Sequence, residues 1–167
     1  MARRIVYLSG RMDGLSYEAA SILRNHATEL LTAAGWEVLN PMRGVSPSTT
    51  IIGDSTLVER ELTDRAIIDR DHDDIRRANV LLYLTADNLS WGSMFEVAYA
   101  ASPAASTPVV AVASTIPASP WARFHVSKFC PTVEEAVAFI IDYYDDVLEK
   151  NYNFSRNATS GYRSEGQ

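Results

Sequence analysis

The side chain best suited to covalent chemistry is the carboxylate of Glu96, in the segment Gly92-Ser93-Met94-Phe95-Glu96. The spacing of Ser93 and Glu96 has two interpretations. In the first, Ser93 is the N-cap of a helix and Glu96 folds back onto the Ser93 amide, forming a capping box. In the second, Glu96 is a nucleophile, and the positive end of the helix helps to keep its carboxylate ionised. Spacing alone favours the capping box, which is the commoner pattern.

A second group of acidic residues lies upstream and comprises Asp69, Asp71, Asp73 and Asp74, with His72 among them. Taken one at a time, such residues are typical of a solvated helix face. Their spacing is not that of a calcium-binding loop, and the three histidines of the chain lack the helical pairing of a zinc site. We therefore expect no metal and no cofactor.

The glycine-bearing segment Ser9-Gly10-Arg11-Met12-Asp13-Gly14 lacks two familiar phosphate-binding patterns. It has neither the G-x-G-x-x-G of dinucleotide-binding proteins nor the Gly-Lys-Ser/Thr of a P-loop. Ser93 also lacks the G-x-S-x-G surroundings of a hydrolase serine. These patterns argue against hydride transfer, nucleoside triphosphate hydrolysis and serine-hydrolase chemistry.

Strands and helices are predicted to alternate along the chain. Short apolar runs indicate strands at 5–8, 36–39, 79–84 and 108–112, with a short fifth strand within 123–129. Helical periodicity indicates helices from the Ser16 cap to about Ala34, from about Leu57 to Ala78, over 93–101, and from Pro131 to about Lys150. Between the second strand and the second helix, 42–56 is predicted to be a long surface loop of the kind that often has a function.

This alternation indicates an α/β fold. Apolar strands joined by helices form parallel sheets that are covered on both faces. We expect a single-domain three-layer sandwich whose five-stranded, mostly parallel sheet has the flavodoxin-like order 2-1-3-4-5. Residues 1–150 should form this domain, and the polar residues 151–167 a mobile tail.

Three segments should meet at one edge of such a sheet. Ligands bind beyond the carboxyl ends of the strands, at the point where the strand order reverses. Segments 9–14, 40–44 and 87–96 follow the three strands that surround that point. The candidate binding residues in these segments are Ser9, Gly10, Arg11, Asn40, Pro41, Ser90, Gly92 and Ser93.

Composition narrows the partners. The formal net charge is −6 and no dense Lys/Arg run is present, so a nucleic acid polymer is not an expected partner. The lone Cys130 excludes an intrachain disulfide and fits a reducing compartment. No signal-peptide core or membrane span is apparent, and we expect a cytoplasmic protein that does not bind membranes.

Four short patterns occur in order along the predicted sheet: Tyr7-Leu8-Ser9-Gly10, Trp36-Glu37-Val38-Leu39-Asn40-Pro41, Asp71-x-x-Asp74-Ile75-x-x-Ala78-Asn79 and Gly92-Ser93-x-x-Glu96-x-x-x-Ala100. Together they resemble the nucleoside 2-deoxyribosyltransferase family, whose relatives include nucleoside 5′-monophosphate N-glycosidases. The resemblance covers about residues 4–140. It changes the favoured interpretation of Glu96 from capping box to nucleophile.

The resemblance implies a retaining double displacement, in which Glu96 attacks C1′ of the sugar and forms a covalent glycosyl ester. Asp71, with Asp74 as the next candidate, matches the aspartate that binds or protonates the base or orients the sugar. Tyr7 matches the tyrosine that holds the nucleophile. The implied partners are a small nucleoside or nucleotide and a free base, and the implied assembly is a homodimer or larger homo-oligomer.

Three features depart from the family. Asn79 stands where many members have aspartate, and Val97 follows the nucleophile in place of Leu-Gly. The family's C-terminal segment, which reaches into a neighbouring subunit, has only a suggestion of a counterpart in Asn151-Tyr152-Asn153-Phe154.

Three functions remain open at this stage. The first is transfer of deoxyribose between bases. The second is hydrolysis of a nucleoside monophosphate, whose phosphate would lie near Ser90, Ser93, Arg11 and Arg43. The third is a nucleotide-binding module without turnover, in which Glu96 only caps a helix.

Overall fold

The computed structural model describes residues 4–43, 63–85 and 87–160, with side chains described as far as residue 147. Most of the predicted loop at 42–56 and the predicted start of the second helix therefore lie outside the described residues, as do residues 161–167 of the predicted tail. None of the helices in the described ranges combines the length and the apolar character needed to cross a membrane.

Five parallel strands form the central sheet. The strands are β1 (Ile5–Ser9), β2 (Glu37–Leu39), β3 (Val80–Tyr83), β4 (Val109–Val112) and β5 (Lys128–Cys130). Their order is β2-β1-β3-β4-β5, and every neighbouring pair is parallel. This confirms the predicted sheet, with β1 and β3 side by side at the point where the order reverses.

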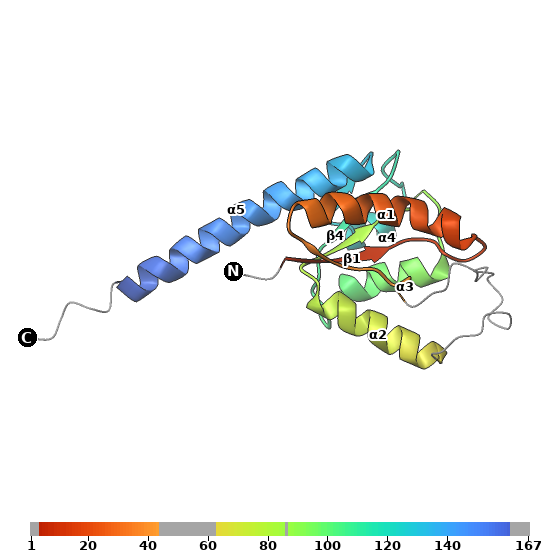
Figure 1. The fold of residues 1–167 in the computed structure, drawn as a ribbon, viewed down its shortest axis with the longest axis horizontal. Coiled ribbons are helices and arrows are strands. Elements are labelled where there is room, and N and C mark those ends of the chain that lie inside the picture. Colours follow the sequence, from red (N-terminus) through yellow and green to blue (C-terminus); the bar gives the residue numbers. More distant parts are fainter. Residues whose placement is uncertain (1–3, 44–62, 86, 161–167) are drawn as a thin grey trace, which may run out of the picture.

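Helices cover both faces of the sheet, so the predicted three layers are present (Figure 1). Helices α1 (Tyr17–Ala33) and α5 (Val133–Ser160) lie on one face, and α2 (Asp64–Arg77) and α3 (Trp91–Ala100) lie on the other. Ser16 caps α1 by accepting a hydrogen bond from the Ala19 amide, and Gly35 follows the helix at φ 81°. That left-handed conformation suits glycine and ends the helix where predicted.

Alternation along β1 decides which side chains reach the site. Val6 and Leu8 pack into the core beneath α1 and α5, whereas Ile5 and Tyr7 pack into the core beneath α2 and α3. Because successive side chains of a strand point to opposite faces, Ser9 shares the face of Tyr7. Tyr7 and Ser9 are therefore directed toward α2 and α3.

Two regions toward the C-terminus differ from prediction. Residues predicted to begin the fifth strand form helix α4 (Pro120–His125), and the strand itself starts at Lys128. Pro120 favours this helix because its fixed φ suits a first helical position, where no amide hydrogen bond is lost. Helix α5 continues to Ser160 rather than ending near Lys150, and its second half projects away from the domain (Figure 1).

Candidate active site

Two hydroxyl groups of β1 hold the carboxylate of Glu96. The Tyr7 hydroxyl donates a 2.8 Å hydrogen bond to Oε1, and the Ser9 hydroxyl donates a 2.5 Å hydrogen bond to Oε2. Tyr7 and Ser9 are fully buried, whereas Glu96 is partly exposed. Three predicted site residues thus form one hydrogen-bonded unit at the carboxyl edge of the sheet.

Burial strongly shifts the pKa values of Glu96 and Tyr7. Removal of the Glu96 carboxylate from water raises its pKa from 4.5 to about 7, although the hydrogen bonds from Ser9 and Tyr7 act in the opposite direction. Burial and the adjacent Glu96 charge raise the pKa of Tyr7 well above its usual range, so Tyr7 remains a hydrogen-bond donor. A carboxylate that is half ionised near neutral pH is common among catalytic groups.

The start of α3 contradicts the capping-box interpretation. The N-cap is Ser90, not Ser93, and the Ser90 hydroxyl accepts a hydrogen bond from the Ser93 amide. Helix α3 begins at Trp91, so Glu96 lies in its second turn and not at the third position that a capping box requires. The Glu96 carboxylate is consequently turned toward β1 rather than toward its own helix end.

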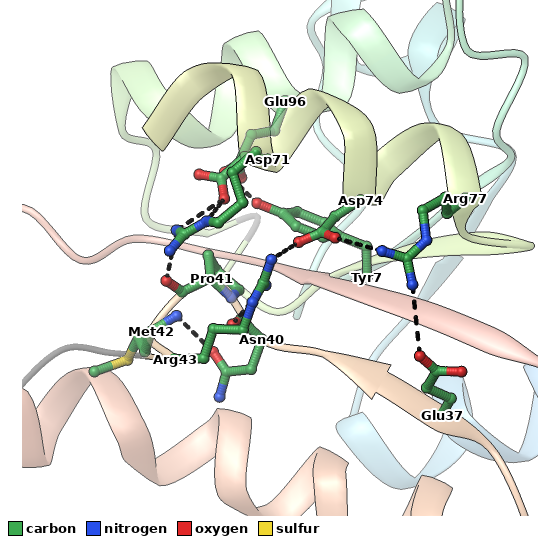
Figure 2. Close-up of polar contacts among 11 residues, drawn as sticks. Tyr7, Glu37, Asn40, Pro41, Met42, Arg43, Asp71, Asp74, Arg77 and Glu96 are labelled. Atoms are coloured by element: carbon green, nitrogen blue, oxygen red, sulfur yellow. Dashed lines mark hydrogen bonds and ion pairs between the residues drawn. The ribbon is translucent and has the colours of Figure 1, made fainter. Parts of the chain in front are cut away.

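Asp71 lies on the inner face of α2 near Glu96, and its negative charge acts on the Glu96 carboxylate. Arg70 donates from Nε to Asp71 Oδ1 at 3.0 Å and from Nη2 to the Pro41 carbonyl at 3.0 Å. Burial raises the pKa of Asp71, while the charge of Arg70 opposes this effect. Asp71 is thus linked to the segment that follows β2 (Figure 2).

Asp74, one turn later on α2, belongs to a separate ion-pair group. Its buried carboxylate is paired with Arg43 and also accepts a 3.5 Å hydrogen bond from Arg77, which lies 3.7 Å from Glu37 (Figure 2). Arg43 also donates to the Asn40 carbonyl at 3.2 Å. Asp74 is occupied in structural contacts, so Asp71 is the α2 carboxylate better placed to meet a ligand beside Glu96.

The two other acidic residues of the cluster behave as an ordinary helix surface. Asp69 and Asp73 are exposed, and they pair with Arg65 and Arg76 of the same helix. Only Asp71 and Asp74 depart from the solvated face that is typical of such a cluster. Within the described residues, no group of three or more His, Cys, Asp and Glu side chains is arranged to hold a metal ion.

The segment after β1 is held from two sides. The Arg11 amide donates to the Thr85 hydroxyl at 2.8 Å, and the Gly10 carbonyl accepts a 2.6 Å hydrogen bond from Arg24 of α1. The Arg11 side chain donates through Nε to the Asp13 carbonyl and not to the Asp13 carboxylate.

The remaining predicted binding residues are divided between two places. Asn40 and Pro41 lie beside Arg43 and Arg70, where Asn40 Oδ1 accepts a hydrogen bond from the Met42 amide at 3.0 Å. Ser90, Gly92 and Ser93 form the start of α3, with the two serine hydroxyls 2.9 Å apart. Gly92 is exposed, and a Cβ added there would meet no heavy atom within 4 Å.

Two arginines of this region were not identified from the sequence. Helical periodicity predicts only coarsely which face of its helix each arginine occupies. Each also binds a backbone carbonyl, Pro41 for Arg70 and Gly10 for Arg24, and no sequence pattern specifies such a contact. The spacing of Arg70 beside Asp71 offered a weak signal. An arginine among the apolar positions of the first helix, as Arg24 is, offered another.

Comparison with solved structures gives the fold an independent counterpart. A 2-deoxyribosyltransferase from the psychrotolerant bacterium Bacillus psychrosaccharolyticus aligns with a TM-score of 0.59 and 15% identity, over 80% of this chain and 90% of that chain. A CMP N-glycosidase from Clostridium botulinum aligns with a TM-score of 0.55 and 16% identity, over 84% of this chain and 99% of that chain. This chain shares their fold.

The same fold also occurs in a protein described as a carrier. The Moco carrier protein from Chlamydomonas reinhardtii aligns with a TM-score of 0.53 and 20% identity, over 89% of this chain and 99% of that chain. No model of a known protein family matches the chain, and no curated protein matches it. Because one fold hosts several functions, the function must be argued from the site.

Proposed function

We propose that this chain breaks the N-glycosidic bond of a small nucleoside with Glu96 as the nucleophile, and transfers the sugar to another base. One observation carries the proposal: the Glu96 carboxylate does not cap its own helix but accepts hydrogen bonds from the Tyr7 and Ser9 hydroxyls, close to the buried Asp71. A carboxylate needed only for helix stability would have no reason to be placed there.

The proposed first step is attack by a Glu96 oxygen on C1′ of the sugar. The bond from C1′ to the base nitrogen breaks, and the base leaves with the electron pair and takes a proton. Asp71 can supply this proton when its carboxyl is protonated, a form that burial favours by raising its pKa against the opposing charge of Arg70. The products of this step are the free base and a glycosyl ester of Glu96.

The proposed second step regenerates the carboxylate. A second base, or a water molecule, attacks C1′ from the opposite face, gives its proton to Asp71, and releases Glu96. Two inversions give overall retention at C1′. Tyr7 and Ser9 favour both steps, since their hydrogen bonds stabilise the carboxylate as nucleophile and as leaving group.

Hydrolysis of a nucleoside 5′-monophosphate is the second candidate, favoured by the similarity of fold to a CMP N-glycosidase. The amides and hydroxyls at the start of α3, with Ser90 and Ser93, suit an anion. Arg43 is already paired with Asp74, so Arg11 is the better cation for a phosphate. A binding module without turnover is the third candidate, favoured by the similarity to a carrier protein.

Chromatography of reaction mixtures separates these candidates. Purified protein is incubated with deoxyadenosine or deoxycytidine, with and without a second free base, and with the corresponding 5′-monophosphates. Transfer predicts a new deoxynucleoside only when the acceptor base is present. Release of base from monophosphates alone would establish the hydrolase, and absence of turnover on every substrate would favour the binding module.

We further expect a homodimer or larger homo-oligomer, as the family resemblance implies, and a cytoplasmic location, as the lone Cys130 indicates. Three large aromatic side chains, Trp91, Trp121 and Phe124, are 72–82% exposed and would suit a subunit contact. Light scattering during size-exclusion chromatography should give at least twice the mass of the chain. The mass of a single chain at micromolar concentration would contradict this expectation. The suggested C-terminal counterpart at 151–154 lies beyond the described side chains.

A further inference from the structure

Arg24 of α1 is a buried cation outside the proposed reaction. It is only 2% exposed, and its guanidinium donates to the carbonyls of Gly10 at 2.6 Å, Ala20 at 2.7 Å and Arg11 at 3.5 Å. Its Nε has no hydrogen-bond partner in the described part of the chain. A buried charge with such incomplete pairing is costly and calls for a physical reason.

The other buried charged side chains of the described residues have ion-pair partners. Asp71 is paired with Arg70, and Asp74 with Arg43 and Arg77. Arg24 contacts only carbonyl oxygens at hydrogen-bond distance, within the ranges that the structure describes. The negative charges that act on it through space are those of Glu96 and, when ionised, Tyr7. Glu96 is therefore its natural counter-charge.

The segment that Arg24 holds is the one that carries Ser9. Ser9 donates to Glu96, and the next residue, Gly10, presents its carbonyl to Arg24. A Cβ at Gly10 would lie 3.3 Å from both Arg24 Nη2 and Thr85 Oγ1, so glycine allows the close approach. The contact between Arg24 and the backbone thus fixes the residue beside a Glu96 ligand.

We propose that Arg24 is a positioning residue that holds the Gly10 carbonyl and so fixes the Ser9 hydroxyl against the Glu96 carboxylate, with its own buried positive charge as the counter-charge of that carboxylate. The catalytic meaning of this inference rests on the proposed function, because it takes Glu96 as the nucleophile. An ionised Glu96 is required twice, as the attacking group and as the group released from the glycosyl ester.

Four titratable side chains of the surrounding elements interact electrostatically with Glu96: Tyr7 of β1, Tyr83 of β3, Asp71 of α2 and Arg24 of α1. Asp71 raises the pKa of Glu96 and Arg24 lowers it, while Arg70 and Arg43 act on Asp71 from farther out. Within the described residues, Arg24 is the cation among the groups that act directly on Glu96. Its loss should disfavour ionisation of Glu96.

The test is a direct titration of Glu96 by ¹³C NMR on protein labelled at the glutamate side-chain carboxyl, with the signal assigned by its loss in Glu96→Gln. Arg24→Gln keeps a hydrogen-bond donor for the Gly10 carbonyl but removes the charge, so the Glu96 titration should move to higher pH by about one unit. Arg24→Lys keeps the charge and should titrate close to the unmodified protein. Arg76→Gln, which neutralises an exposed arginine paired with Asp73, is the matched control and should leave the titration unchanged.

An unchanged Glu96 titration in Arg24→Gln, or an equal shift in Arg24→Lys, would overturn the inference. If Arg24→Gln does not fold, the inference stands or falls on Arg24→Lys together with Gly10→Ala. The added Cβ of Gly10→Ala would lie 3.3 Å from Arg24 Nη2 and Thr85 Oγ1, which disturbs the contact and should also raise the titration midpoint. The acid limb of the turnover rate should move with the NMR midpoint. If the protein lacks N-glycosidic activity but its Glu96 titration still moves to higher pH in Arg24→Gln, the proposed function is wrong and the role of Arg24 stands.

Discussion

Glu96 is held in a balance between burial and hydrogen bonding. Shielding from water raises its pKa to about 7, and the hydroxyls of Ser9 and Tyr7 oppose that increase. The carboxylate is therefore partly ionised at neutral pH, as a nucleophile that must also act as a leaving group requires. The three residues should respond to substitution as one unit.

Replacing Glu96 with glutamine should remove turnover without unfolding the protein. The amide has nearly the same shape but cannot form the glycosyl ester, so base release should fall by about a thousandfold or more. Chromatography measures the rate, and circular dichroism checks the fold. Glu29→Gln, at an exposed position of α1, is the matched control and should keep full activity. Comparable rates for both variants would exclude Glu96 as the nucleophile.

The same variant makes a prediction about stability and pH. The pKa of Glu96 is 4.5 ordinarily and about 7 in the folded protein, so the folded state binds the extra proton between these values. The original protein should therefore lose stability relative to Glu96→Gln as pH rises through this window. Allowing for partial exposure, we expect a relative loss of roughly 1–3 kcal/mol between pH 5 and pH 8. Urea denaturation measures it, and parallel stability curves would refute the assigned shift.

Removing the Tyr7 hydroxyl should weaken the nucleophile. Tyr7→Phe loses the 2.8 Å hydrogen bond to Glu96. Because that hydrogen bond lowers the pKa of the Glu96 carboxylate, its loss should raise this pKa. Turnover at neutral pH should fall by about tenfold, and its acid limb should move to higher pH. Tyr143→Phe is the control, because Tyr143 is half exposed on α5, on the opposite face of the sheet from Glu96. Equal effects of the two variants would argue against a specific role for Tyr7.

At the scale of elements, α2 is joined to the segment after β2 by two arginine contacts. Arg70 links Asp71 to the Pro41 carbonyl, and Arg43 links Asp74 to the Asn40 carbonyl. The helix that carries Asp71 is thereby fixed relative to β2. The position of Asp71, the proposed proton donor, therefore depends on these contacts as well as on the helix itself.

Removing the two arginine partners of Asp74 should destabilise the protein more than removing the Asp74 charge itself. Substituting both Arg43 and Arg77 with methionine leaves a buried, unpaired carboxylate and should lower the free energy of unfolding by about 3–5 kcal/mol. Asp74→Asn should cost less, since both arginines are 40–51% exposed and can reach water. Arg65→Met, in an exposed pair with Asp69, should be nearly neutral. Urea denaturation compares them, and equal losses for the double variant and Asp74→Asn would contradict the burial argument.

The elements themselves were largely predictable, because strand order follows from apolar runs and right-handed crossovers. The exact helix starts were not. Ser90 and Ser93 are both good N-caps in sequence, and only the structure shows that Ser90 is used. Helix α4 was missed because the residues around Phe124 favoured a strand, whereas Pro120 begins a helix there.

The site was predictable where it follows from the sheet edge and not where it depends on tertiary contacts. Tyr7, Ser9 and Glu96 come together because β1 and α3 meet at the reversal of strand order. The arginine contacts depend on the distances between helices and loop carbonyls, which no periodicity specifies. Arg24 and Arg70 therefore emerged only from the structure.

At the scale of the whole molecule, the fold alone does not decide the function. The fold is shared with a 2-deoxyribosyltransferase, a CMP N-glycosidase and a Moco carrier protein, all at 15–20% identity. What favours an enzyme here is the combination of a held, shielded carboxylate and a second buried carboxylate on a neighbouring helix. The central claim is therefore the covalent step on Glu96.

Trapping that covalent step tests the claim most directly. A deoxynucleoside with fluorine at the sugar 2′ position slows both steps of a retaining displacement, and a good leaving base restores the first, so the glycosyl ester accumulates. Peptide mapping by mass spectrometry should then find the fluorinated sugar on the peptide that contains Glu96, and no label in Glu96→Gln. Base release with no labelled peptide, or a label on another residue, would contradict the account.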